Sequence, residues 1–134
     1  MSNKYLKTLL ILITSITLLI GCKKKIEESK CLTYLKAPVT KVESATAALV
    51  NEEVNLTVSF SCYNGCGGFG NLNEVSTGNS TTIFINARYD GCICTQDVPT
   101  RQTIYKFKKS LPGTYELKFM QSGETYITHI IKVQ

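Results

Sequence analysis

The segment VNLTVSFSC at residues 54–62 decides the fold, because apolar and polar residues alternate in it without a break. Successive side chains of a β-strand point to opposite faces of the sheet, so a period of two predicts a strand with one buried face. The apolar positions of this strand are Val54, Leu56, Val58, Phe60 and Cys62. They are the first expected members of the core.

Similar alternation recurs in the segments 83–89, 105–107, 115–119 and 127–133. The short polar stretch QSGE at 121–124 predicts a turn that joins the last two of these strands as a hairpin. A first strand is expected within residues 38–49. Because no long helical period follows residue 21, six or seven strands in about 100 residues predict a single antiparallel β-sandwich.

The stretch LPGTY at 111–115 precedes one predicted strand. It resembles the corner found before the penultimate strand of immunoglobulin-like and fibronectin-like sandwiches. The resemblance implies an all-β immunoglobulin-like or fibronectin-like fold in which the Tyr115 hydroxyl ties back to the backbone. The chain has no tryptophan, and the 115–120 strand has no cysteine. The resemblance therefore concerns the architecture and not the antibody-type family.

The first 20 residues have the pattern of a signal peptide. Residues 1–7 are short and basic, and residues 8–20 form an uncharged apolar run. As a helix this run would be about 20 Å long, too short for the roughly 30 Å hydrocarbon core of a bilayer. A basic start followed by a short apolar run predicts export.

The four residues Leu19-Ile20-Gly21-Cys22 resemble the lipobox of bacterial lipoproteins. The resemblance implies removal of residues 1–21 and acylation of Cys22, with palmitate-type chains that hold the protein on a membrane. The residue after Cys22 is Lys23 and not the aspartate of inner-membrane retention, so the outer membrane is the expected location. We expect residues 22–32 to be a polar tether and residues 33–134 to be the sandwich domain. Whether the domain faces the periplasm or the cell surface stays open.

The formal net charge of +5 comes largely from the N-terminal segments. From residue 31 onward there are nine basic and eight acidic residues, which leaves the domain nearly neutral. A neutral domain lacks the basic surface that binds phosphate backbones, so we expect no nucleic-acid partner.

Five cysteines follow the lipobox: Cys31, Cys62, Cys66, Cys92 and Cys94. Export places them in an oxidising compartment, where disulfides are the usual outcome. We predict at least one bridge between the Cys62/Cys66 turn and the Cys92/Cys94 segment. Because five is an odd number, one thiol is left over, and Cys31 beside the tether is the expected one.

An alternative use of Cys62, Cys66, Cys92 and Cys94 is a thiol-redox or zinc site, since four thiolates from two short turns suit tetrahedral zinc. Cys92-x-Cys94 is tighter than the usual zinc turn. His129 is the only histidine of the chain, and we expect it at the edge of the core and not as the base of a catalytic pair.

The stretch GCGGFG at 65–70 matches the glycine pattern of dinucleotide-binding loops. That function requires a helix to follow the loop. The next residues, NLNEVSTG, are poor helix formers, so we expect neither a nucleotide nor any other cofactor. We expect instead a flexible turn whose glycines allow positive φ and bring Cys66 close to its partner. This loop is the best candidate interaction surface of the sequence.

No catalytic set of residues stands out. The sequence therefore predicts a lipid-anchored, non-catalytic binding or accessory module of the bacterial envelope. Its partner could be an envelope protein or a glycan, and the alternative is the thiol-redox or metal-binding protein described above.

Overall fold

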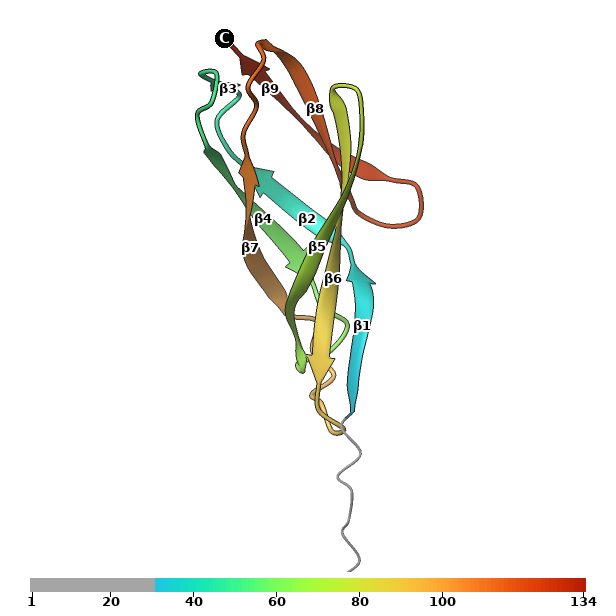
Figure 1. The fold of residues 1–134 in the computed structure, drawn as a ribbon. Coiled ribbons are helices and arrows are strands. Elements are labelled where there is room, and N and C mark those ends of the chain that lie inside the picture. The colour runs from blue at the N-terminus through green and yellow to red at the C-terminus, as the bar shows by residue number, and fades with distance from the viewer. Residues whose placement is uncertain (1–30) are drawn as a thin grey trace, which may run out of the picture.

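The computed structural model describes residues 31–134, which form nine β-strands and no helix (Figure 1). The predicted signal peptide and the predicted lipidation site at Cys22 lie outside the described residues. The strands are β1 (Leu32–Ala37), β2 (Val39–Glu43), β3 (Ala47–Ala48), β4 (Val54–Ser61), β5 (Gly67–Thr77), β6 (Ser80–Asp90), β7 (Thr100–Phe107), β8 (Gly113–Met120) and β9 (Tyr126–Val133).

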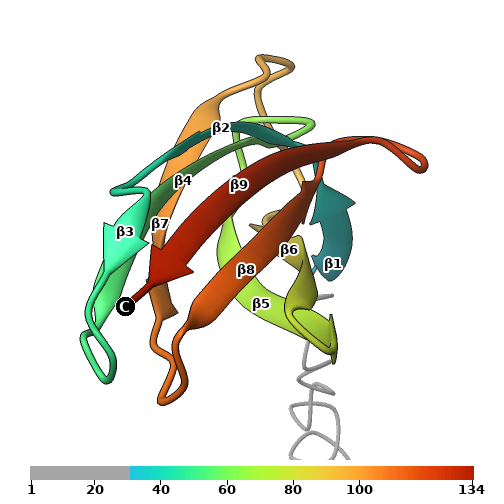
Figure 2. The same ribbon diagram turned by 90° about the horizontal axis from the view of Figure 1, so that it is seen from above.

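The strands form two sheets that pack face to face as a sandwich (Figures 1 and 2). The large sheet has the order β1-β6-β8-β9-β3, with β5 on the other edge of β6, and the small sheet has the order β2-β4-β7. The predicted all-β sandwich is confirmed. Most pairs are antiparallel, as expected, whereas β6 with β8 and β3 with β9 run parallel.

The N-terminal strand crosses from one sheet to the other at Pro38. β1 pairs with β6 in the large sheet, and β2 pairs with β4 in the small sheet. Proline has no backbone N–H, which suits a point where the ladder is interrupted. Because β1 begins at Leu32, the last residue assigned to the tether belongs to the sandwich.

The core fills the space between the sheets. Most of its side chains stand at the alternate apolar positions predicted from the sequence. Phe60, Phe119, Ile83, Leu56 and Ile131 are completely or almost completely buried. The opposite face of the small sheet is largely polar, with Ile104 as an exposed apolar residue.

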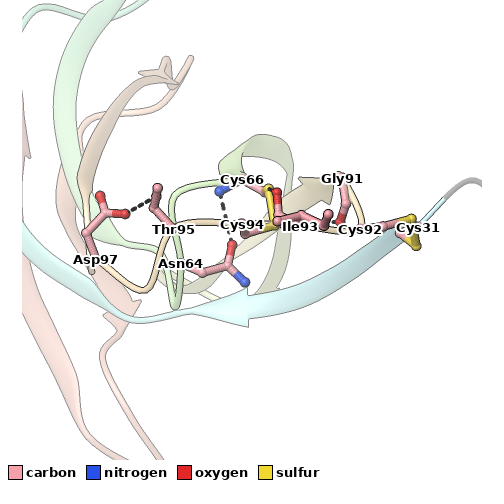
Figure 3. Close-up of a disulfide and its surroundings, with 9 residues drawn as sticks. All are labelled: Cys31, Asn64, Cys66, Gly91, Cys92, Ile93, Cys94, Thr95 and Asp97. Atoms are coloured by element: carbon pink, nitrogen blue, oxygen red, sulfur yellow. Dashed lines mark hydrogen bonds between the residues drawn. A yellow bond between two sulfur atoms is a disulfide. The ribbon is translucent and has the colours of Figure 1, made fainter.

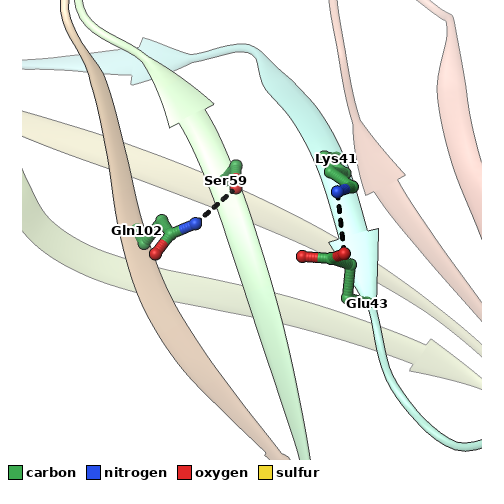
Figure 4. A network of polar contacts seen from close by, with 4 residues as sticks. All are labelled: Lys41, Glu43, Ser59 and Gln102. Atoms are coloured by element: carbon green, nitrogen blue, oxygen red, sulfur yellow. Dashed lines mark hydrogen bonds and ion pairs between the residues drawn. The ribbon is translucent and has the colours of Figure 1, made fainter.

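On that outer face Gln102 donates to the hydroxyl of Ser59 over 3.3 Å, and Lys41 pairs with Glu43 (Figure 4). The alternation of residues 54–62 thus separates the core face of the small sheet from its solvent face.

Two predicted turns have the expected geometry. In the hairpin between β8 and β9, the backbone N–H of Gln121 donates to the carbonyl oxygen of Thr125 over 2.9 Å, and Gly123 has φ 58°. At the corner before β8, the Tyr115 hydroxyl donates to the carbonyl oxygen of Leu111 over 3.0 Å, as the sandwich resemblance implies.

The glycine-rich segment differs from its prediction. Residues 67–77 are not part of a flexible turn but form β5, which pairs with β6 along its length and has an irregularity between Phe69 and Asn71. Most residues of β5 are exposed, so this strand forms without the alternation of apolar and polar residues that a half-buried strand requires. The backbone ladder and the bond from the Tyr105 hydroxyl to Glu74, 2.7 Å long, hold it in place.

Candidate binding site at the disulfide-linked end

Two disulfides lie at the end of the sandwich where the described chain begins (Figure 3). Cys66 bonds to Cys94, which confirms the predicted bridge between the two cysteine segments. Cys31 bonds to Cys92, so the expectation that Cys31 would be left free is wrong. The free cysteine among the described residues is Cys62, which is buried.

The position of each cysteine in the ladder explains this pairing. The N–H of Gly91 donates to the carbonyl oxygen of Cys31 over 2.9 Å, which places Cys31 directly beside Cys92. Cys62 directly follows β4, lies on the inward-facing side of its alternation, and is completely buried in the core. The alternation of residues 54–62 already indicates a buried Cys62, whereas the place of Cys31 depends on β1, which the sequence pattern did not reveal.

The four cysteines of the alternative zinc site are not brought together as free thiols. Cys66 and Cys94 are joined to each other, and Cys92 is joined to Cys31. Burial raises the pKa of the Cys62 thiol, although the nearby Arg101 charge and the Tyr89 hydroxyl act in the other direction. Within residues 31–134 no three histidine, cysteine or acidic side chains are grouped so that they could hold a metal ion.

Labelling with iodoacetamide should distinguish Cys62 from the other cysteines of the domain. Since Cys62 is buried and a raised thiol pKa leaves little reactive thiolate, native protein should stay unlabelled, and protein unfolded without reductant should gain one label. Peptide mapping should place that label on Cys62. A label on Cys31 in native protein would contradict this arrangement.

The loop between β6 and β7, residues 91–99, packs against the turn before β5. Gly65 donates its N–H to the carbonyl oxygen of Thr95 over 2.9 Å, and a Cβ on Gly65 would lie 1.9 Å from the Thr95 hydroxyl oxygen. A Cβ on Gly67 would lie 2.4 Å from the Cβ of Cys62. These glycines are needed for close approach, as predicted. The expected positive φ is wrong for them, since the positive values in the described chain lie elsewhere.

Two hollows lie beside β1 and share Tyr63. The first, about 290 Å³, is lined by β1 and by the disulfide-linked end, including Leu32, Leu35 and Cys94. The second, about 450 Å³, continues from Pro38 to the β8–β9 hairpin. We call this pair of hollows the β1 groove.

The β1 groove is bordered by a free strand edge. The Gly91–Cys31 bond marks a hydrogen-bonded pair, and such pairs alternate along an antiparallel ladder. Residues 33, 35 and 37 therefore bond to β6, while the backbone groups of 32, 34 and 36 point away from it. Consistent with this, the carbonyl oxygen of Lys36 accepts a bond from the Tyr63 hydroxyl over 3.1 Å.

The apolar side chains beside this edge are unusually exposed for a strand. Leu32, Tyr34 and Leu35 are 43%, 50% and 46% exposed. Tyr63 stacks against Tyr89, whose hydroxyl accepts a bond from the Tyr63 N–H over 2.9 Å, so the ring between the two hollows is held in position. The expected interaction surface, residues 65–70, lies at the same end but contributes no residue to the lining of the groove.

His129 lies half-buried on β9, where its Nε2 donates to the carbonyl oxygen of Ala45 over 3.2 Å. This is the edge-of-core position expected for it. Its bonding partner is a backbone carbonyl and not a cysteine. In the portion from Cys31 to Gln134, no helix is long and apolar enough to cross a membrane.

The comparison with family models decides the family of the chain. The model of the ORF11 beta-sandwich domain matches residues 56–130, more than half of the chain. The chain belongs to this family. The match extends from β4 into β9 and includes the β6–β7 loop, whereas β1 and its groove precede it. No match is found among curated proteins or among solved structures.

Proposed function

We propose that this ORF11 beta-sandwich domain is a lipid-anchored, non-catalytic binding module of the bacterial envelope. Its β1 groove takes an extended segment of a partner protein. The observation that carries the proposal is the open edge of β1 beside two hollows. Such an edge can accept a further strand, so that backbone hydrogen bonds supply affinity and side-chain pockets supply specificity.

The groove favours a polypeptide over a glycan. Leu32 and Tyr34 present backbone N–H and C=O groups at the spacing of a strand, which a peptide backbone matches and a sugar does not. The lining side chains include Leu32, Leu35, Ala37 and Met120. Only one lining residue, Lys36, is charged, so the expected segment is apolar in alternate positions.

Anchoring is tested by the intact mass of protein extracted from membranes. The Leu19-Ile20-Gly21-Cys22 stretch predicts the loss of residues 1–21 and the addition of two or three acyl chains. Cys22→Ser should release the protein from the membrane fraction. A full-length, unmodified chain, or unchanged localisation of the variant, would refute the anchor.

Addition of a strand along β1 is tested in cells by a photo-cross-linking amino acid at position 34, with position 104 as the control. Tyr34 and Ile104 are about equally exposed, at 50% and 51%, but Ile104 lies on the small sheet. We expect a discrete protein adduct from position 34 only, and peptide mapping should show an extended segment. Equal adducts at both positions, or none at 34, would contradict the proposal.

A proline substitution tests strand addition separately from folding. With the cross-linking residue moved to the exposed position 32, Tyr34→Pro removes an N–H that points away from β6, so the ladder and the fold should survive. The cross-linked adduct should be lost. Tyr34→Val, which keeps the N–H, should retain it, and retention by the proline variant would rule out strand addition.

A further inference from the structure

Ile93 is the most exposed large apolar side chain among residues 31–134, with 96% of its surface accessible. It stands between Cys92 and Cys94, and each of these is bonded to a different part of the chain. The carbonyl oxygen of Ile93 lies 3.7 Å from the Cys66 sulfur. Both neighbours of Ile93 in the chain are thus held by disulfides, which fixes the position of this solvent-exposed residue (Figure 3).

The loop that carries Ile93 lies at the end of the sandwich where the described chain begins, opposite the C-terminus (Figure 1). Cys31, bonded to Cys92, is nine residues after Cys22. Nine residues span at most about 30 Å. A lipid on Cys22 would thus keep the Ile93 end within a short distance of the membrane surface.

The charges around Ile93 suit a lipid surface. The loop of residues 91–99 has one charged side chain, Asp97, whose carboxylate accepts a bond from the Thr95 hydroxyl. The sequence just before Cys31 contains four lysines, at 23, 24, 25 and 30, and two glutamates, at 27 and 28, which leaves a net charge of +2. Lysines next to a membrane anchor are attracted to anionic headgroups.

The side chain of Ile93 alone is too small to form a stable interface with another protein. Stable protein contacts bury on the order of 800 Å² on each partner, which one isoleucine between two half-cystines does not provide. An exposed apolar side chain held out by a rigid loop can instead enter the boundary between headgroups and acyl chains.

We propose that Ile93 inserts into the membrane that holds the lipid anchor and that it fixes the orientation of the sandwich there. This inference rests on the proposed lipidation of Cys22. With the Ile93 end against the lipid, β1 extends away from the membrane. The first hollow, lined by Cys31 and Cys94, then lies near the lipid, and the second, beside Pro38 and the β8–β9 hairpin, lies farther from it.

The absence of tryptophan from the chain provides a direct test. Ile93→Trp places a single indole at the tip, and Leu111→Trp places one at the β7–β8 loop, where Leu111 is 68% exposed. Each variant is expressed as the full chain, extracted from membranes and reconstituted into vesicles of phosphatidylethanolamine and phosphatidylglycerol, with and without brominated acyl chains. We expect bromine quenching and a shift to shorter emission wavelength for the indole at 93, and neither for the indole at 111.

The outcomes separate this inference from the anchor itself. If the variants float with the vesicles but the indole at 93 is not quenched, the anchor is sound and the insertion is refuted. Equal quenching at 93 and 111 would mean that the domain has no preferred orientation, which also overturns it. If the variants do not float, the proposed lipidation is refuted, and the insertion that depends on it is refuted as well.

Discussion

Replacing both Cys31 and Cys92 with alanine is expected to lower the free energy of unfolding by about 4 kcal/mol on the chain-entropy model of disulfides. The bridge closes a loop between residues 61 positions apart, and longer loops leave more conformational freedom in the unfolded chain once they are opened. On the usual scaling for a domain of about 100 residues, the melting temperature should fall by roughly 15–30 °C. Guanidinium unfolding followed by circular dichroism measures the change.

The second disulfide is the matched control. Cys66→Ala with Cys94→Ala opens a loop with a separation of 28 and should cost about 3.5 kcal/mol, slightly less than the first pair. Both partners are removed in each variant, so no new free thiol can form another bridge. If removal of Cys31 and Cys92 left stability unchanged, the N-terminal strand would not be held by this bond in solution.

Phe119→Ala is expected to cost about 3–5 kcal/mol, the range for truncating a buried phenylalanine. Phe119 is completely buried on β8 and pairs with Ile83 across the parallel contact to β6. Its ring also meets Tyr105 of the small sheet edge to face, with centroids 5.7 Å apart. The substitution therefore leaves a cavity at a contact between the two sheets. Thermal unfolding should show a loss similar to that of the first disulfide.

Two variants test whether packing causes this loss. Phe119→Leu keeps most of the side-chain volume and should cost considerably less than Phe119→Ala. Ile130→Ala removes a side chain that is 49% exposed on β9 and should have little effect. If Phe119→Ala cost less than Ile130→Ala, the inward orientation of β8 would be refuted.

The strands with one buried face could be predicted from the sequence, because burial on one side imposes a period of two. Residues 54–62 and 115–119 show this clearly, and Phe60 and Phe119 are core residues as the parity requires. β5 could not be predicted, since both of its faces are largely exposed and its pairing depends on backbone bonds to β6. The same reason applies to β1, whose residues are exposed except for Ala37, which is part of the core.

The candidate site was predictable only in part. The spacing of the cysteines indicates a bridge between two segments, which is Cys66–Cys94. The pairing of Cys31 and the groove around Tyr63 depend on strand register, and register is set by contacts between residues distant in the sequence. From the sequence alone the glycine-rich loop is therefore the expected interaction surface, whereas the hollows lie beside β1.

The Cys31–Cys92 bond also determines how the domain responds to a pull on its N-terminus. Without it, tension would reach the sandwich at the first residues of β1. With it, force enters covalently at two places, β1 and the chain just after β6, and β6 lies between β5 on one edge and β1 and β8 on the other. Because the bond ties the adjacent ends of β1 and β6 together, the pull cannot open the β1–β6 ladder from that end and acts on both strands at once. A lipid anchor on Cys22, as proposed above, would apply its pull at this cross-linked end of the domain.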